Sequence, residues 1–194
     1  PFREKEIVLK LKELIRKDAI KKEYSFMHVC GTHENIVSHF GIRKILPDNI
    51  RIIAGPGCPV CVCGASDIDF AINISKIGNT ILCIFGDMYR VPGTNYTLEA
   101  AKGSNVKVVY SPFDALKIAQ NNPDKNILFF AVGFETTAVG IGALIKREPP
   151  RNFFIIPSLK IMPPILELLL GIGDLKIDGF ILPGHVLTVM GTGD

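Results

Sequence analysis

The sequence predicts an α/β protein made of two similar domains, each a mostly parallel sheet with helices on both faces, in a Rossmann-like arrangement. The first observation is a series of short, β-rich runs that are continuously apolar, which is typical of strands buried on both faces. The second is that segments of helical length separate these runs, an alternation typical of parallel sheets. The third is composition, because a chain of 194 residues that is 47% hydrophobic can bury sizeable cores.

The expected strands are the apolar runs that stop at glycine, proline, serine or cysteine. They cover residues 24–30, 51–55, 80–86, 106–111, 126–133, 152–158 and 179–184. The expected helices lie between them, at residues 34–45, 66–77, 94–103, 112–121, 136–147 and 162–170. Residues 3–22 carry apolar side chains at helical spacing among basic ones, which predicts an amphipathic helix with a solvated face.

The most polar linker, NNPDKN at residues 121–126, predicts a domain boundary. The first domain is then residues 1–122, and the second is residues 123–194, which we expect to be incomplete at its C-terminal end. Ligands of open α/β sheets bind beyond the carboxyl ends of the strands, so two such domains that face each other are expected to share a central cleft.

Composition and motifs exclude several classes of partner. The net charge is only +3, and no aromatic platform or base-reading motif accompanies the basic stretch, so no nucleic acid is expected. No apolar run approaches the ~20 residues that span a bilayer, and the charged start lacks a signal peptide's apolar core, so we expect no membrane and a cytoplasmic protein. A phosphate-binding glycine motif is also absent from the sequence.

Five cysteines in such a chain favour metal binding or thiol chemistry over a disulfide scaffold. The segment GPGCPVCVC at residues 55–63 follows the second predicted strand. Its Cys58 and Cys61 can form a reversible disulfide or hold one metal ion between two thiolates. Cys63 is either a third ligand or a packing residue, and Cys83 lies within a strand and is expected in the core.

The first predicted strand ends in CGTH, residues 30–33. Cys30 is expected near a helix N-terminus, where the helix dipole favours negative charge, and His33 can bind metal or transfer a proton. With Cys58 and Cys61 they would form a sulfur-rich site suited to iron, copper(I) or zinc. The alternative is a buried structural cysteine beside a surface histidine. His28, inside the strand, is expected to be structural.

Other polar residues follow further strands. Glu135 could act as acid, base or anchor, and Thr136 could cap the next helix or contact a cofactor. Asp87 and Arg90 could hold a ligand or each other, and His185 closes the last predicted strand. For these residues a structural role is about as well supported as a functional one.

The chain resembles the HypD family of hydrogenase maturation factors in six segments that keep the family's order. They are CGTH at 30–33, GPGCPVC at 55–61, FGDMYRVPG at 85–93, YSPFDALKIA at 110–119, GFETTA at 133–138 and DGFILPGHV at 178–186. The resemblance implies two α/β domains facing a cleft and a role in building the Fe(CN)2CO unit of [NiFe]-hydrogenases. It also implies two partners, a small HypC-like chaperone and a HypE-like cyanide donor.

The resemblance implies that Cys30 is the iron ligand, that Cys58 and Cys61 are a redox-capable dithiol, and that three polar residues line the cleft: His33, Glu135 and His185. It further implies a [4Fe-4S] cluster in the family's C-terminal region, whose cysteines are not in this chain, so no cluster is assigned to it.

The chain departs from the family pattern at three positions. Glu34 stands where the family usually has a threonine, Val139 stands where a proline is common, and Cys63 is not a usual feature.

Two other functions remain open from the residues. A general thiol–disulfide oxidoreductase would use Cys58 and Cys61 and need no iron. A non-catalytic zinc-binding module would use Cys30 and His33 in addition.

Overall fold

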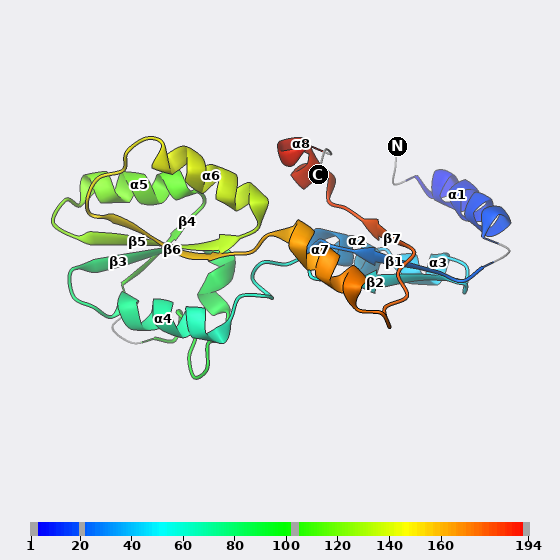
Figure 1. Cartoon of the computed structure of the whole chain (residues 1–194), viewed down its shortest axis with the longest axis horizontal. Coiled ribbons are helices and arrows are strands. Elements are labelled where there is room, and N and C mark those ends of the chain that lie inside the picture. The colour runs from blue at the N-terminus through cyan, green and yellow to red at the C-terminus, as the bar shows by residue number, and fades with distance from the viewer. Residues whose placement is uncertain (1–3, 20–21, 102–104, 192–194) are drawn as a thin grey trace. The chain divides into compact units, whose positions relative to one another are not determined.

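The computed structural model describes residues 4–19, 22–101 and 105–191. Its elements are α1 (Lys5–Asp18), β1 (Tyr24–His28), α2 (Gly31–His39), α3 (Ile42–Ile45), β2 (Ile50–Ala54), α4 (Ala65–Ser75), β3 (Thr80–Phe85), the 3-10 helix η1 (Gly86–Arg90), β4 (Val106–Val109), α5 (Pro112–Asn121), β5 (Asn126–Gly133), α6 (Glu135–Ile145), β6 (Phe153–Leu159), α7 (Met162–Gly171), β7 (Gly179–Ile181) and α8 (Gly184–Met190) (Figure 1). The predicted α/β class with two mostly parallel sheets is confirmed.

The chain forms two compact units. Unit 1 comprises Pro1–Cys58 and Pro164–Asp194, and unit 2 comprises Pro59–Pro163. Unit 1 holds a three-stranded sheet in the order β2-β1-β7, and unit 2 holds a four-stranded sheet in the order β4-β3-β5-β6. Every pairing within the two sheets is parallel.

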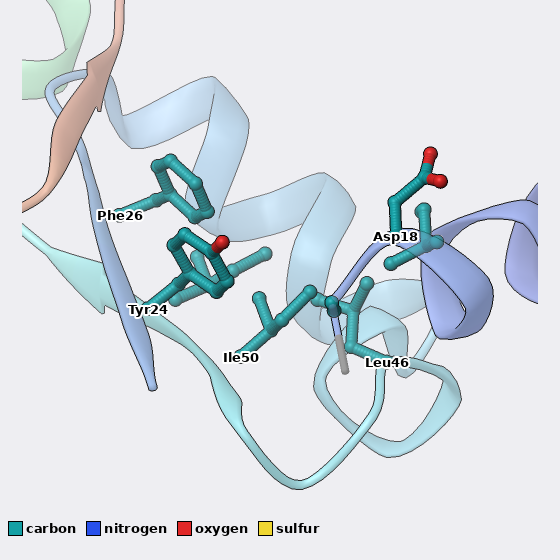
Figure 2. Close-up of a pocket in the computed structure, with 8 residues that line it drawn as sticks. Asp18, Tyr24, Phe26, Leu46 and Ile50 are labelled. Carbon is teal, nitrogen blue, oxygen red and sulfur yellow. The ribbon is translucent and has the colours of Figure 1, made fainter. Parts of the chain in front are cut away.

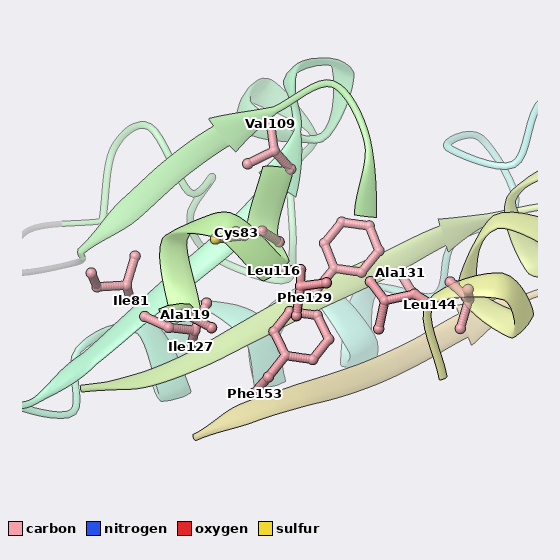
Figure 3. Packing of buried hydrophobic residues seen from close by; sticks show 12 residues of the cluster. Ile81, Cys83, Val109, Leu116, Ala119, Ile127, Phe129, Ala131, Leu144 and Phe153 are labelled. Atoms are coloured by element: carbon pink, nitrogen blue, oxygen red, sulfur yellow. The ribbon is translucent and has the colours of Figure 1, made fainter. Parts of the chain in front are cut away.

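The two central strands of the unit 2 sheet, β3 and β5, are buried on both faces, as their continuously apolar runs predict, whereas the edge strands β4 and β6 are partly exposed. Helices α5 and α6 cover one face and α4 covers the other (Figure 1). Neighbouring residues of β5 serve opposite faces: Phe129 packs in the cluster under α5 and α6, whereas Phe130 packs in the cluster on α4. Figure 3 shows the first cluster, with Leu116 of α5 and Leu144 of α6 among its members. This packing fixes the ends of β5 and β6, where Glu135 and Ser158 lie.

The sheet of unit 1 is completed by a strand from far along the chain. β7 pairs with β1 in parallel register, with Phe26 opposite Gly179 and His28 opposite Ile181. Asp178, just before β7, fastens this pairing: its backbone N–H donates to Ser25 O at 2.8 Å, and its carboxylate accepts from Ser25 N at 2.9 Å. The pKa of Asp178 lies below its usual value. The main cause is a hydrogen bond from Lys22 at 2.6 Å, and the second is the hydrogen bond from the Ser25 N–H.

An Asp178→Asn variant is expected to have a lower free energy of unfolding than the parent at pH 7, because it loses charge-assisted hydrogen bonds. A depressed carboxyl pKa stabilises the fold above the unfolded value of 3.8 and loses that contribution as the pH falls below it. The parent and the variant should therefore converge in stability near the acid end of the range. Urea unfolding of the parent and the variant at pH 7 and at acid pH measures the difference in their unfolding free energies. A difference of the same size at the two pH values would contradict the role of the charge.

The structure divides the chain differently from the predicted 1–122 and 123–194. The predicted boundary falls between α5 and β5, and β5 pairs directly with β3 inside one sheet. The segment at 121–126 is an ordinary helix-to-strand surface loop, and polar composition does not distinguish such a loop from a domain linker. Strands β3 and β4 accordingly belong to unit 2, and β7 returns to unit 1.

Two predicted helices and the last predicted strand need correction. The helix expected at 34–45 ends at His39, and a second one starts at Ile42, because Gly41 adopts a left-handed conformation with φ of 60°. No helix covers the described part of 94–103, whose residues 102 and 103 lie outside the described residues; η1 follows β3 instead. The last strand ends at Ile181, and α8 follows it.

An apolar pocket of about 350 Å³ lies in unit 1 away from the cysteines. Figure 2 shows Tyr24 and Ile50, the first residues of β1 and β2, on its wall, with Asp18 at the end of α1 beside them. It therefore lies at the amino ends of the strands, opposite the predicted site. Among the helices of the described ranges, none has the length and apolar character needed to cross a membrane.

Candidate functional site

Cys30 is held at the start of α2. It is the N-cap residue, with extended backbone angles of φ −155° and ψ 132°. Its carbonyl oxygen accepts hydrogen bonds from His33 N at 3.1 Å and Glu34 N at 3.3 Å, which closes the first turn of the helix. The residue is 8% exposed, so its thiol is buried rather than open to solvent.

The loop after β2 lies directly against Cys30. Gly31 N donates to Gly57 O at 3.1 Å, and a Cβ placed on Gly57 would lie 2.0 Å from the nitrogen of Cys30. A Cβ placed on Gly31 would lie 3.8 Å from the Cβ of Cys58. Only a glycine at position 57 lets the two backbones approach this closely. The structure therefore brings Cys30 and Cys58 together at the carboxyl ends of β1 and β2.

His33 stands beside a second histidine that is fully buried. The ring centroids of His33 and His28 are 6.0 Å apart in an edge-on arrangement, and His28 is 2% exposed. Burial, followed by the electrostatic influence of His28 and His185, lowers the pKa of His33 below its ordinary value. His33 is therefore neutral at neutral pH. Its Nδ1 is buried and has no hydrogen-bond partner within the described residues, so a nitrogen is left for a ligand.

His185 is close enough to His33 to influence its pKa. It is exposed, and it belongs to the first turn of α8 rather than to the end of a strand. Unit 1 thus contains four of the predicted site residues: Cys30, His33, Cys58 and His185.

A charged network that the sequence did not reveal surrounds Glu34. Arg43 Nη1 and Nη2 donate to the two carboxylate oxygens of Glu34, each at 2.8 Å, and Arg43 Nε donates to Ile52 O at 3.0 Å. Ser38 Oγ donates to one oxygen at 2.6 Å, and His28 Nε2 lies 2.8 Å from the other. Arg43, then Ser38 and His28, hold the pKa of Glu34 well below its usual range. The spacing of Glu34 and Arg43 in the sequence does not predict this ion pair, because the two residues lie on two helices joined at Gly41.

Cys61 and Cys63 belong to unit 2. Cys61 is exposed and Cys63 is half-buried. Cys63 Sγ lies 3.4 Å from Ser158 Oγ, which donates to Asp67 Oδ2 at 2.6 Å. Because Ser158 uses its proton on Asp67, its oxygen is the acceptor for the Cys63 thiol. Since the division falls between Cys58 and Pro59, the two cysteines of the Cys-x-x-Cys pair belong to different units.

Glu135 and Thr136 open α6 at the end of β5. The N-cap of α6 is Phe134, without a side-chain cap, so Thr136 does not cap the helix. The side chain of Thr137 packs against Gly133 instead: a Cβ placed on Gly133 would lie 2.2 Å from Thr137 Oγ1. One oxygen of Glu135 accepts from Met162 N, and the other is buried without a partner within the described residues. Glu135 therefore anchors Met162 and keeps one oxygen unused.

Asp87 and Arg90 both lie on η1 of unit 2 and are exposed. Arg90 Nε pairs with Glu99 Oε1 at 3.2 Å rather than with Asp87. The suggestion that these two residues hold each other is therefore wrong. Cys83 is fully buried in β3, as predicted, and burial raises the pKa of its thiol to about 12.

Within the described residues, no group of three or more histidine, cysteine, aspartate or glutamate side chains is arranged to hold a metal ion. The candidate donors of unit 1, Cys30, His33 and Cys58, are nevertheless of the soft residue types that suit iron, copper(I) or zinc.

The chain is similar to known proteins along almost all of its length. The family model for HypD, described as the hydrogenase formation hypA family, matches residues 4–194. The chain is 42% identical to hydrogenase maturation factor HypD2 of Bradyrhizobium diazoefficiens over 98% of this chain and 54% of that protein. It is 40% identical to hydrogenase maturation factor HypD of Escherichia coli over the same shares. It is also 40% identical to HypD of Azotobacter vinelandii, over 89% of this chain and 48% of that one. The chain thus spans about half the length of these relatives.

Proposed function

Because the chain belongs to the HypD family of hydrogenase formation proteins, we propose that it is a maturation factor on which the Fe(CN)2CO unit of [NiFe]-hydrogenases is assembled. The iron fragment is the cargo of the protein. Its natural partners are a small HypC-like chaperone and a HypE-like cyanide donor.

The observation that carries this proposal is the approach of Cys30 and Cys58 in unit 1. Gly57 lies against the backbone of Cys30, and Cys58 lies against Gly31, so the thiols come from two neighbouring strand ends. Iron that carries cyanide and carbon monoxide accepts thiolate ligands well. Cys30 is the iron ligand in this proposal, and a metal-bound thiol must release its proton on binding.

His33 has a defined part in this proposal. Its lowered pKa keeps the imidazole neutral, so at neutral pH it accepts a proton or a metal bond rather than donating a proton. Its Nδ1, which has no hydrogen-bond partner among the described residues, is the atom that supports this role. His185, which is exposed nearby, and Glu135, with one oxygen unused, are proposed to contact the cargo or its ligands.

Cys58 and Cys61 are proposed to work as a redox pair. Joining two thiols in a disulfide releases two electrons and two protons, which is the exchange that a Cys-x-x-Cys pair supports. Asp87, Arg90 and Thr136 stay candidates for ligand contact in unit 2.

The test is infrared spectroscopy of the chain purified without oxygen after production with a HypC-like chaperone and a HypE-like cyanide donor. We expect cyanide and carbonyl stretching bands together with bound iron. Absence of the bands, together with turnover of insulin disulfides by the iron-free chain, would favour the general oxidoreductase. Tightly held stoichiometric zinc in place of iron would favour the zinc-binding module.

A further inference from the structure

We propose that Glu34 is a positioning residue for the Cys30 thiol. The inference rests on the proposed function in giving Cys30 the role of iron ligand. Glu34 occupies a position where no ligand role has been assigned, and its side chain makes more hydrogen bonds than any cap or surface role requires.

Glu34 holds the Cys30 segment from two sides. Its backbone N–H donates to Cys30 O at 3.3 Å, and its carboxylate lies 2.8 Å from His28 Nε2. Because His28 lies only two residues before Cys30, these hydrogen bonds close a ring with the backbone of His28, Val29 and Cys30. A change in the backbone angles of Cys30 must break one of the two bonds.

Arg43 fixes this ring to the neighbouring strand. Its two terminal nitrogens grip the carboxylate of Glu34 as a planar fork, and its Nε donates to Ile52 O in β2. β2 continues into the loop that holds Cys58. The network therefore ties together the two strands whose ends carry the thiols.

Charge and geometry are both needed for this arrangement. Glutamate offers two acceptor oxygens, and here they serve Arg43, Ser38 and His28 together. Glutamine would offer one acceptor and would place an NH2 group against the donors of Arg43 or His28. Lysine at position 43 would keep the positive charge but lose the fork.

A contribution to the global stability of the chain does not explain why this network exists. Glu34 and Arg43 are 38% and 39% exposed, and ion pairs this open contribute little to global stability. The positioning role therefore predicts a local effect on Cys30 at a nearly unchanged melting temperature.

The experiment is alkylation of the iron-free chain with iodoacetamide, with the rate at each cysteine read by mass spectrometry. In the parent chain Cys30 should react slowly, because it is buried. In Glu34→Gln its rate should rise about tenfold or more, as expected when charged hydrogen bonds no longer oppose local opening. Arg43→Lys should raise the rate in the same direction, since the fork and not the charge alone is needed.

The matched control is Glu13→Gln, which removes another exposed carboxylate of unit 1, one that pairs with Arg16 at 3.8 Å. Its Cys30 rate should equal that of the parent. An unchanged Cys30 rate in Glu34→Gln overturns the proposal. The proposal is also overturned if the alkylation rate rises equally at Cys30 and Cys83 and the melting temperature falls, because that pattern reports general destabilisation. No iron enters these measurements, so their outcome is independent of the infrared test.

Discussion

A Cys30→Ser variant is expected to fold like the parent chain and to lose the cyanide and carbonyl infrared bands. Serine is close in size to cysteine and is a favoured N-cap residue, so α2 should start as before. The hydroxyl is a poor ligand for iron that prefers soft thiolates. Since removing even a supporting partner of a metal ligand costs roughly 10- to 100-fold, retained iron should fall by at least about 100-fold.

The measurement is infrared spectroscopy with iron analysis on protein purified with both partners. Cys83→Ala is the matched control, because it removes a thiol that is buried in β3 and lies in unit 2. It should keep the bands while losing some stability to the cavity it leaves. Undiminished bands in Cys30→Ser would remove Cys30 from the role of iron ligand.

A Gly57→Ala variant is expected to be damaged both in stability and in iron retention. The new methyl group would lie 2.0 Å from Cys30 N and 2.1 Å from Val29 C, which are backbone atoms that cannot rotate away. Either the loop or the start of α2 must shift, and overpacking of this kind costs about 1–3 kcal/mol or more. The shift separates Cys58 from Cys30, so iron retention should fall along with the free energy of unfolding.

Gly31→Ala is the control for this variant. It adds the same methyl group on the facing segment at the start of α2, where the nearest atom is the Cβ of Cys58 at an ordinary 3.8 Å. Its unfolding free energy in urea should stay within about 0.5 kcal/mol of the parent. Equal stability of both glycine variants would show that the contact between Gly57 and Cys30 is looser than the structure has it.

The strands are the part of the fold that the sequence predicted best. All seven expected segments overlap strands of the structure, from β1 at Tyr24–His28 to β7 at Gly179–Ile181. Continuous apolar runs predict them because a strand buried on both faces has no polar side to present. Helix ends were predicted less well, because the break at Gly41 depends on one left-handed residue.

The approach of Cys30 and Cys58 was predictable from their positions after two parallel strands. The role of Glu34 was not, because its partner Arg43 and the buried His28 lie on other elements. The pairing of Arg90 with Glu99 was missed for the same reason. Side-chain partners across elements depend on helix packing angles that no local pattern encodes.

The sequence alone determined the α/β class, the strands, and the residue types that stand at their carboxyl ends, because hydrophobic burial and turn chemistry act locally along the chain. Only the tertiary structure decided which strands share a sheet. It placed β3 beside β5 and brought β7 back to β1, although the most polar linker suggested another division. Parallel strands present similar apolar edges to one another, so the choice of partner is made by the packing of whole faces, which is a property of the folded chain.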